Sequence, residues 1–275
     1  MTQRILVAGG TGTVGRVVVD QLLDAGVQVR VLSRGHRPQG STGQVQQVIG
    51  DVKTGAGLTE AISGVDTVVA CLDPVDRLVE AAVAAGKPHL VYISIVGIDR
   101  VPFSYYQRKL ADEQLISDSG LRWTVLRATQ FHDLVAAALR VLSAPPVMVV
   151  PAGWSFQPID VRDVGVRLAD LAQGEPGERV PDIGGPQVLP ITELARQYLA
   201  AMGKRRPIVS MPVPGRVARA YRSGGHLAPD RAVGTIPFEH YLDELSEAGQ
   251  QPYGDMIGGN IRQLRRKLTP RRWRS

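Results

Sequence analysis

Three evenly spaced glycines stand between the first strand-like run of the chain and its first helix-like run, and they constrain the fold more than any other feature. Gly9, Gly12 and Gly15 separate an apolar run over residues 5–8 from a helical pattern over residues 14–25. In such a turn one glycine allows the tight bend, another lets a pyrophosphate approach the backbone, and the third lets helix and strand pack closely. The free N–H groups and the dipole of the helix then attract the anion. The motif therefore predicts a dinucleotide site, although its spacing differs by one residue from G-x-G-x-x-G.

The first 130 residues alternate between runs rich in Val and Ile and helix-like stretches. Strands are predicted over residues 5–8, 27–32, 45–49, 65–71, 90–94 and 124–127, and helices over residues 14–25, 58–62, 76–85 and 105–119. Apolar strands separated by helices are typical of a parallel sheet that is buried on both faces. Right-handed crossovers then favour an α/β fold with a doubly wound parallel sheet of the Rossmann type. Gly26, Gly86 and Gly120 stand where three of these helices should end.

The regular alternation stops near residue 130, where Pro and Gly begin to divide short elements. Helices are still predicted over residues 161–172 and 191–202, the second with Thr192 as its N-cap. We expect a dinucleotide-binding core over residues 1–130 and a small C-terminal substrate lobe over residues 131–260, partly interleaved with the core. Residues 261–275 form a basic tail with seven cations and no acidic residue, so the rest of the chain has a net charge of −1. Such a tail either binds nucleic acid or anionic lipid or is simply a solvated terminus.

Composition excludes several classes of protein. The 275 residues include one cysteine, which rules out a disulfide framework, and the five histidines show no metal-binding spacing. No apolar run is long enough for a membrane span, and the chain enters its first strand without a separate signal segment. The sequence therefore predicts a cytoplasmic protein with no metal, no membrane span and no specific nucleic-acid partner. Monomer and homodimer remain equally open.

The end of the second strand indicates which dinucleotide is bound. An NAD site needs an acidic residue about 20 positions beyond the glycines to hold the ribose hydroxyls. No acid occurs between Asp24 and Asp51, whereas Ser33 and Arg34 end the strand and Arg37 follows. A guanidinium and a hydroxyl suit a 2′-phosphate, so this pattern favours NADP(H) over NAD(H). The alternative is a solvated loop cation.

Two further strand ends should lie near the cofactor. Asp51 and Val52 follow the third strand, where they either border the adenine or serve only as turn residues. Cys71 and Leu72 end the fourth strand, which passes near the cofactor in a sheet of this topology. No base stands beside Cys71 in the sequence, so we interpret this cysteine as a packing residue rather than a nucleophile.

A tyrosine and a lysine on the helix after the fifth strand are the catalytic candidates. Tyr105 and Lys109 are four residues apart and share a helical face. A phenol can act there as a general acid while the ammonium lowers its pKa and holds a ribose hydroxyl. Tyr106 competes for the role, and Ser94 ends the fifth strand with its hydroxyl toward the same cleft. The alternative is that both tyrosines only pack at a helix start.

These segments resemble a known family. The glycine motif, residues 91–97 (Val-Tyr-Ile-Ser-Ile-Val-Gly), the helix from residue 105 and residues 123–131 are similar to atypical short-chain dehydrogenases, most of all to the NmrA-like branch that binds nicotinamide dinucleotides. The likeness continues through residues 158–164 and 184–186, so it covers about four-fifths of the chain.

The resemblance implies roles for individual residues. The pyrophosphate would lie against Gly9, Thr11, Gly12, Thr13, Val14 and Gly15, and the 2′-phosphate against Ser33 and Arg34. The catalytic set would be Ser94, Tyr105 and Lys109. Residues 128–131 would border the nicotinamide and the substrate. Of these, Thr129 is predicted to contact the cofactor, and Gln130 and Phe131 are predicted to contact the substrate. His132, the next residue, is a further substrate candidate from its position alone.

The function expected from these residues is an NADP(H)-dependent oxidoreductase that moves a hydride to or from a small organic carbonyl, quinone or enone. Two alternatives stay open, a redox sensor that binds the dinucleotide without turnover and a redox-neutral isomerase or cyclase. His132 either contacts the substrate, alone or with Asp133, or is a satisfied polar residue. Other charged groups are interpreted as structural: Asp160, Arg162 and Asp163 as a salt-bridge cluster, and Arg216, Arg219 and Arg222 as a solvated helical stripe.

Overall fold

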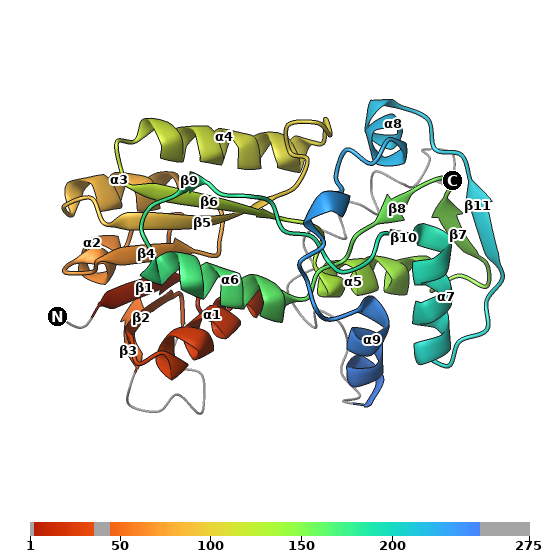
Figure 1. Cartoon of the computed structure of the whole chain (residues 1–275), viewed down its shortest axis with the longest axis horizontal. Coiled ribbons are helices and arrows are strands. Elements are labelled where there is room, and N and C mark those ends of the chain that lie inside the picture. The colour runs from red at the N-terminus through yellow and green to blue at the C-terminus, as the bar shows by residue number, and fades with distance from the viewer. Residues whose placement is uncertain (1–2, 36–44, 248–275) are drawn as a thin grey trace, which may run out of the picture.

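The computed structural model describes residues 3–35 and 45–247, which form a sheet with helices on both faces and a smaller lobe at one end (Figure 1). Arg37 and the basic tail over residues 261–275 lie outside the described residues. Among the residues that are described, no helix is both long and apolar enough to cross a membrane. Within the same ranges, His, Cys, Asp and Glu side chains form no group of three or more that could hold a metal ion.

The core is a parallel sheet of seven strands in the order β3-β2-β1-β4-β5-β6-β9. The order reverses between β1 and β4, and ligands of such sheets bind beyond the carboxyl ends of the strands at this switch point. The strand bounds are β1 (Arg4–Ala8), β2 (Gln28–Ser33), β3 (Val45–Ile49), β4 (Thr67–Ala70), β5 (His89–Ile95), β6 (Trp123–Ala128) and β9 (Glu178–Arg179).

Helices cover both faces of this sheet, as the alternating pattern predicts. On one face lie α1 (Thr13–Asp24) and α6 (Val161–Gln173), and on the other lie α2 (Leu58–Ile62), α3 (Asp76–Ala84) and α4 (Ser104–Asp118) (Figure 1). Alternate residues of each strand enter separate apolar cores, so that Val7 packs with the α1 side and Leu6 with the α3 side. Gly26, Gly86 and Gly120 adopt positive φ directly after their helices, which confirms the predicted ends.

The core takes two elements from beyond residue 130. Helix α6 packs on α1 so closely that a Cβ on Gly165 would lie 2.4 Å from Val17 Cγ1. Strand β9 adds the seventh strand beside β6. Sequence reasoning missed β9 because its two residues, Glu178 and Arg179, are both exposed and carry no apolar signal.

The lobe contains the remaining elements around an apolar core of its own, which includes Leu194, Tyr198 and Phe238. The prediction of Thr192 as N-cap is wrong. The N-cap is Pro190 without a side-chain bond, because the Ile191 N–H donates to Trp154 O and the helix starts there. The lobe elements are α5 (His132–Leu142), β7 (Met148–Pro151), β8 (Ser155–Phe156), β10 (Leu189–Pro190), α7 (Ile191–Ala201), β11 (Ile208–Met211), α8 (Arg216–Arg222), η1 (Pro229–Arg231) and α9 (Phe238–Glu247).

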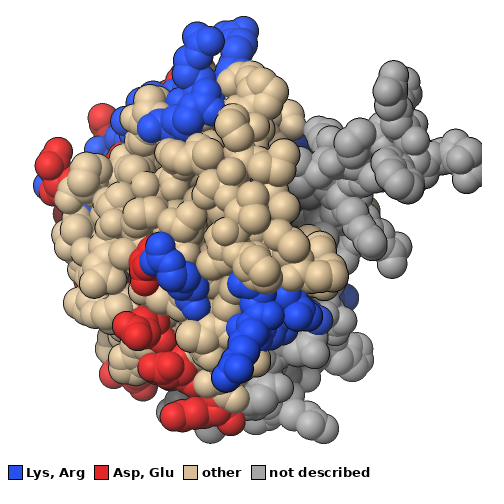
Figure 2. All heavy atoms as spheres, turned by 90° about the vertical axis from the view of Figure 1, so that its right-hand side faces the viewer, with Lys and Arg blue, Asp and Glu red and all other residues tan. Residues whose placement is uncertain are grey.

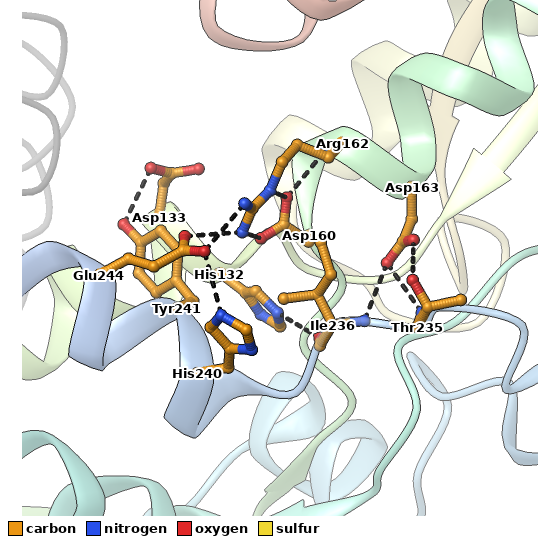
Figure 3. A network of polar contacts seen from close by, with 10 residues as sticks. All are labelled: His132, Asp133, Asp160, Arg162, Asp163, Thr235, Ile236, His240, Tyr241 and Glu244. Atoms are coloured by element: carbon orange, nitrogen blue, oxygen red, sulfur yellow. Dashed lines mark hydrogen bonds and ion pairs between the residues drawn. The ribbon is translucent and has the colours of Figure 1, made fainter.

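Ionic contacts fasten the lobe to α6 (Figure 3). The Arg162 guanidinium binds the Asp160 carboxylate at 2.9 Å and the Glu244 carboxylate of α9 at 2.8 Å. The Asp163 carboxylate accepts hydrogen bonds from the backbone and the hydroxyl of Thr235. Burial opposes ionisation of Asp160, but the hydrogen bonds from Arg162 outweigh it and lower the pKa of this carboxyl. The predicted salt bridge is confirmed for Asp160 and Arg162, whereas the prediction is wrong for Asp163, whose carboxylate binds Thr235 and not Arg162.

Two buried histidines make the stability of the fold dependent on pH. Burial lowers the pKa of His89 and of His226 to about 4, against about 6.5 in an unfolded chain. Below about pH 6.5 the unfolded chain therefore binds more protons, so the stability that is complete at pH 7 is lost progressively as the pH falls toward about 4. We expect the urea midpoint to fall between pH 7 and pH 5.

The His89→Gln variant should show a shallower dependence on pH than the wild type. Equal urea midpoints for the wild type at pH 7 and pH 5 would contradict the burial of these two imidazoles in neutral form.

Candidate cofactor and active site

The glycine turn leaves the start of α1 open to an anion. Gly9 has φ +84°, and its carbonyl accepts the Gly12 N–H at 2.9 Å. Gly12 is the N-cap of α1, with no side-chain capping bond and no acidic residue in the first turn. A Cβ on Gly15 would lie 2.1 Å from Gly9 O, so helix and turn touch through bare backbone. This is the cradle that a diphosphate requires, and the residues present fit that group.

A cation that sequence reasoning missed lies at the same turn. Arg16 stands in the first turn of α1, and its Nε donates to Thr11 O at 2.8 Å. Its position one residue after Gly15 was the available signal. The side chain of Val14 is buried in the core, so Val14 offers a ligand its backbone only, whereas Thr11 and Thr13 are half-buried.

Ser33 and Arg34 lie one strand away from the glycine turn, at the carboxyl end of β2. The Gly9 N–H donates to Leu32 O at 3.4 Å, which ties the turn to that strand end. Ser33 is buried and its hydroxyl donates to Gly35 O at 2.9 Å, while Arg34 is exposed. Arg34 is therefore the more exposed of the two side chains.

The other predicted cofactor contacts are placed at the same edge of the sheet. Asp51 closes a turn, because its carboxylate accepts the Lys53 N–H at 2.8 Å and its own N–H donates to Ala56 O. Val52 is buried in the core. Burial raises the pKa of the Cys71 thiol to about 12, which is the behaviour of a packing residue and not of a nucleophile. A Cβ on Gly9 would lie 3.0 Å from Cys71 O, so the chain after β4 directly borders the turn.

Tyr105 and Lys109 both contact Asp73, a residue that sequence reasoning did not identify. The Asp73 carboxylate accepts the Tyr105 hydroxyl on Oδ2 at 3.1 Å and the Lys109 ammonium on Oδ1 at 3.0 Å. Oδ1 also accepts the hydroxyl of Tyr92, a residue of β5, at 2.8 Å. Asp73 follows the carboxyl end of β4 at the switch point, and this placement was the signal that could have found it.

Lys109 is nearly saturated by its protein partners. Besides Asp73, its Nζ donates to Tyr92 Oη and to Ile93 O, both at 2.8 Å, and the side chain is only 6% exposed. Three donors therefore have three acceptors. Burial, and then the Asp73 carboxylate, raise the pKa of Tyr105, so this phenol is fully protonated near neutral pH. The prediction that the Lys109 ammonium lowers this pKa is therefore wrong, because the ammonium binds Asp73 and the carboxylate is what the phenol contacts.

Tyr106 points elsewhere. It is buried on the lobe side of α4, with its Oη 3.5 Å from Tyr221 Oη of α8, and no hydrogen bond joins it to Asp73. The two adjacent tyrosines thus have different surroundings, since Tyr105 contacts the Asp73 carboxylate and Tyr106 lies inside an apolar cluster between core and lobe.

Ser94, the residue before the last one of β5, is a buried polar group without a hydrogen-bond partner among the described residues. The residue is 2% exposed, and its Oγ has no hydrogen bond among the described residues. Buried hydroxyls without partners are rare in folded proteins, so this one marks a place where a ligand atom can complete the hydrogen bonding.

The residues after β6 mostly form hydrogen bonds within the protein. The Thr129 hydroxyl donates to Gln157 O at 2.5 Å and accepts the Gly185 N–H at 3.2 Å. Gln130 is buried, and its Nε2 donates to His226 O at 3.2 Å. Phe131 pairs with Ile159 through a backbone bridge.

His132 is fully buried, and its Nε2 lies 2.9 Å from Ile236 O (Figure 3). Burial lowers the pKa of this imidazole, so the bond is that of a neutral ring donating to the carbonyl. Asp133 accepts the Tyr241 hydroxyl and does not bond His132. The placement favours a structural role for His132 over contact with a substrate, although only one ring nitrogen is satisfied, since the buried Nδ1 has no hydrogen-bond partner among the described residues.

Comparison with known proteins gives a family and several relatives. A family model described as NAD(P)H-binding matches residues 9–167. A (4-alkanoyl-5-oxo-2,5-dihydrofuran-3-yl)methyl phosphate reductase of Streptomyces griseus is 33% identical over 212 residues, which cover 73% of this chain and 74% of the relative. An NAD(P)H azoreductase of Xenophilus azovorans is 31% identical over 216 residues, with coverage of 73% and 74%.

Among solved structures, an NADPH-dependent quinone oxidoreductase of Escherichia coli in complex with NADPH matches with a TM-score of 0.74 at 18% identity, over 88% of this chain and 99% of that one. A triphenylmethane reductase of Citrobacter in complex with NADP(H) matches with a TM-score of 0.69 at 19% identity, over 88% and 99%. At these identities the likeness shows the fold.

Proposed function

Because the chain belongs to the NAD(P)H-binding family, as an atypical short-chain dehydrogenase, we propose that it is an NADP(H)-dependent reductase of small carbonyl, quinone or enone compounds. The observation that carries this proposal is the placement of Tyr105. Its hydroxyl is held by the Asp73 carboxylate at the carboxyl edge of the same sheet whose first strand leads into the open glycine turn. The reductases among the relatives support a small-molecule substrate and net redox chemistry.

The family match and the NADPH complex of the structural neighbour support NADP(H) as the cofactor. Bound NADP(H) supplies the hydride. The backbone from Gly9 to Gly15 would hold the diphosphate, with Arg16 as a nearby countercharge. Ser33 and Arg34 would hold the 2′-phosphate, and Ser94 and Thr129 lie on the strand ends that would border the nicotinamide.

The Arg34→Gln variant tests the preference for a phosphorylated ribose. A guanidinium contributes charge-assisted hydrogen bonds to a phosphate, each of about 1.5–3 kcal/mol. We expect NADPH affinity to fall at least about tenfold, since about 1.4 kcal/mol corresponds to a factor of ten, while NADH affinity stays within about twofold.

Nicotinamide fluorescence titrations with both cofactors measure this, and Arg77→Gln, which removes a guanidinium from the first turn of α3, is the matched control. Equal losses of affinity for NADPH and NADH would show that Arg34 does not bind the 2′-phosphate.

The proton chemistry follows from the surroundings of Tyr105. Burial and Asp73 keep the phenol of Tyr105 protonated, and its one hydroxyl proton is donated to the Asp73 carboxylate in the structure. A reduction requires this hydroxyl to turn from Asp73 to the substrate oxygen and to transfer the proton there as the hydride reaches the substrate carbon. Lys109 acts through Asp73, because its ammonium offsets the negative charge of the carboxylate that the Tyr105 hydroxyl binds. The free hydroxyl of Ser94 can bind the same substrate oxygen as negative charge develops on it.

The proposal is tested by titrating NADPH and then following its oxidation with a panel of quinones, enones and azo compounds. We expect saturable binding and turnover with at least one of these classes. NADPH binding without turnover across the panel would favour a redox sensor. Cofactor that co-purifies and is never oxidised, while a metabolite is isomerised or cyclised, would favour redox-neutral chemistry.

A further inference from the structure

A polar cavity lies outside the cofactor site, between the loop that follows β5 and helix α8. Its volume is about 360 Å³, and its lining includes Arg100, Gln107, Arg216 and Arg219. Arg100 comes from the core, and Arg216 and Arg219 come from the lobe, so the cavity joins the two parts of the molecule. We name it the α8 cavity.

The arginines of the α8 cavity are not used by the fold. Arg216 and Arg219 have no hydrogen bond or ion pair within the described part of the chain, and Arg100 has only a 4.0 Å contact with Asp99. By contrast, Arg222, the third member of the stripe, donates to Val213 O at 2.8 Å. Figure 2 shows Lys and Arg side chains gathered at the top of the lobe face, where α8 lies.

The one carboxylate in the lining is already engaged. Asp99 accepts a hydrogen bond of 3.2 Å from Arg127, whose side chain is 5% exposed. Arg127 is also bound by Glu113 through two hydrogen bonds. The negative charges of Asp99 and Glu113 balance the positive charges of Arg127 and Arg100. The positive charges of Arg216 and Arg219 are therefore not neutralised.

The start of helix α4 also favours a negative charge in the cavity. The cavity borders its first turn through Pro102 and Gln107. This helix of 15 residues begins without an acidic residue in its first turn, so the positive end of its dipole is not offset by a carboxylate of the helix. Gln107 adds an amide donor.

We propose that the α8 cavity is a binding site for a phosphate-type anion. Guanidinium groups bind phosphate oxygens through paired charge-assisted hydrogen bonds, and a cavity of this size accommodates a phosphate monoester. Gln107 and Tyr105 are two residues apart on α4 and therefore point to different faces of the helix, so the α8 cavity is separate from the contact between Tyr105 and Asp73. The anion is either a free phosphate or the phosphate group of a small molecule.

The test uses inorganic phosphate as the probe, titrated by calorimetry at constant ionic strength into protein saturated with NADP⁺. The wild type is compared with the double variant Arg216→Gln/Arg219→Gln. The matched control is Arg205→Gln/Arg206→Gln, which removes two exposed cations from a second basic cavity at the end of α7. We expect phosphate affinity to fall at least about tenfold in the α8 variant and to stay unchanged in the control.

Equal phosphate affinity in the wild type and the α8 variant, or equal losses in both double variants, would overturn the proposal. A second arm distinguishes the sources by comparing NADPH-dependent reduction of dihydroxyacetone phosphate with that of dihydroxyacetone. A preference for the phosphate ester that disappears in the α8 variant assigns the site to a substrate, and no preference assigns it to free phosphate. The site does not depend on the proposed reductase function, because loss of phosphate binding in the α8 variant would support it even in a protein without turnover.

Discussion

The Gly15→Ala variant is expected to lose NADPH binding. A Cβ at this position would lie 2.1 Å from Gly9 O and 2.8 Å from Gly10 Cα, and neither backbone atom can turn aside as a flexible side chain would. Helix α1 must then move away from β1, and this movement separates the N–H groups that would hold the diphosphate. We expect NADPH affinity to fall more than about 100-fold, since a displaced turn loses several charge-assisted hydrogen bonds at once.

Stability should fall as well, because α1 packs on both the sheet and α6. Gly12→Ala separates the effect on binding from the effect on folding. Its Cβ would lie 3.2 Å from Gly9 O, a contact that small shifts relieve, so this variant should fold and bind NADPH more weakly. Gly174→Ala is the control, because its nearest neighbour would be 3.4 Å away at the far end of α6. Unchanged NADPH affinity in both Gly15→Ala and Gly12→Ala would show that this turn does not hold the diphosphate.

The Tyr105→Phe variant is expected to retain NADPH binding and lose turnover. Removing a general acid typically costs about 10²–10⁴ in rate. The phenyl ring keeps the packing of α4 while the proton that Asp73 orients is gone. We therefore expect kcat to fall by at least about 100-fold with little change in the Kd for NADPH, measured by fluorescence and by stopped-flow oxidation of the cofactor.

Tyr106→Phe is the matched control, because its hydroxyl contacts Tyr221 and not Asp73. This variant should keep kcat within about threefold, as expected for loss of contacts with neutral side chains away from Asp73. A large loss in Tyr106→Phe together with full turnover in Tyr105→Phe would exchange the roles of the two tyrosines.

Much of the core could be predicted because its signals are local. Buried parallel strands have short apolar runs as their sequence pattern, and the helices between them end at glycines that adopt positive φ. The glycine turn was recognisable for the same reason, since its three residues are adjacent to the strand and helix that they join. Strand β9 has only two residues, both exposed, and it pairs with β6 across more than 50 positions of sequence. No local pattern encodes such a strand.

The sequence was enough to predict the two site residues on α4, Tyr105 and Lys109, but not the residues that contact them. The spacing of Tyr105 and Lys109 placed both on one face, but the carboxylate that both contact comes from the end of another strand. Asp73 is an ordinary loop residue in the sequence, and only the switch point between β1 and β4 gives its position meaning. His132 shows the converse, since a histidine at the start of a helix looks available for chemistry until α9 is seen to cover it.

The central claim is that this chain moves a hydride from bound NADPH to a small molecule. The most direct measurement is a single turnover with NADPH deuterated at one face of nicotinamide C4 and an enone taken from the substrate panel, followed by mass spectrometry of the product. We expect deuterium on a product carbon from one of the two labelled faces only, and no product from Tyr105→Phe in the same time. Reduced product without deuterium from either labelled face, or bound NADPH that no member of the panel ever oxidises, would contradict the account.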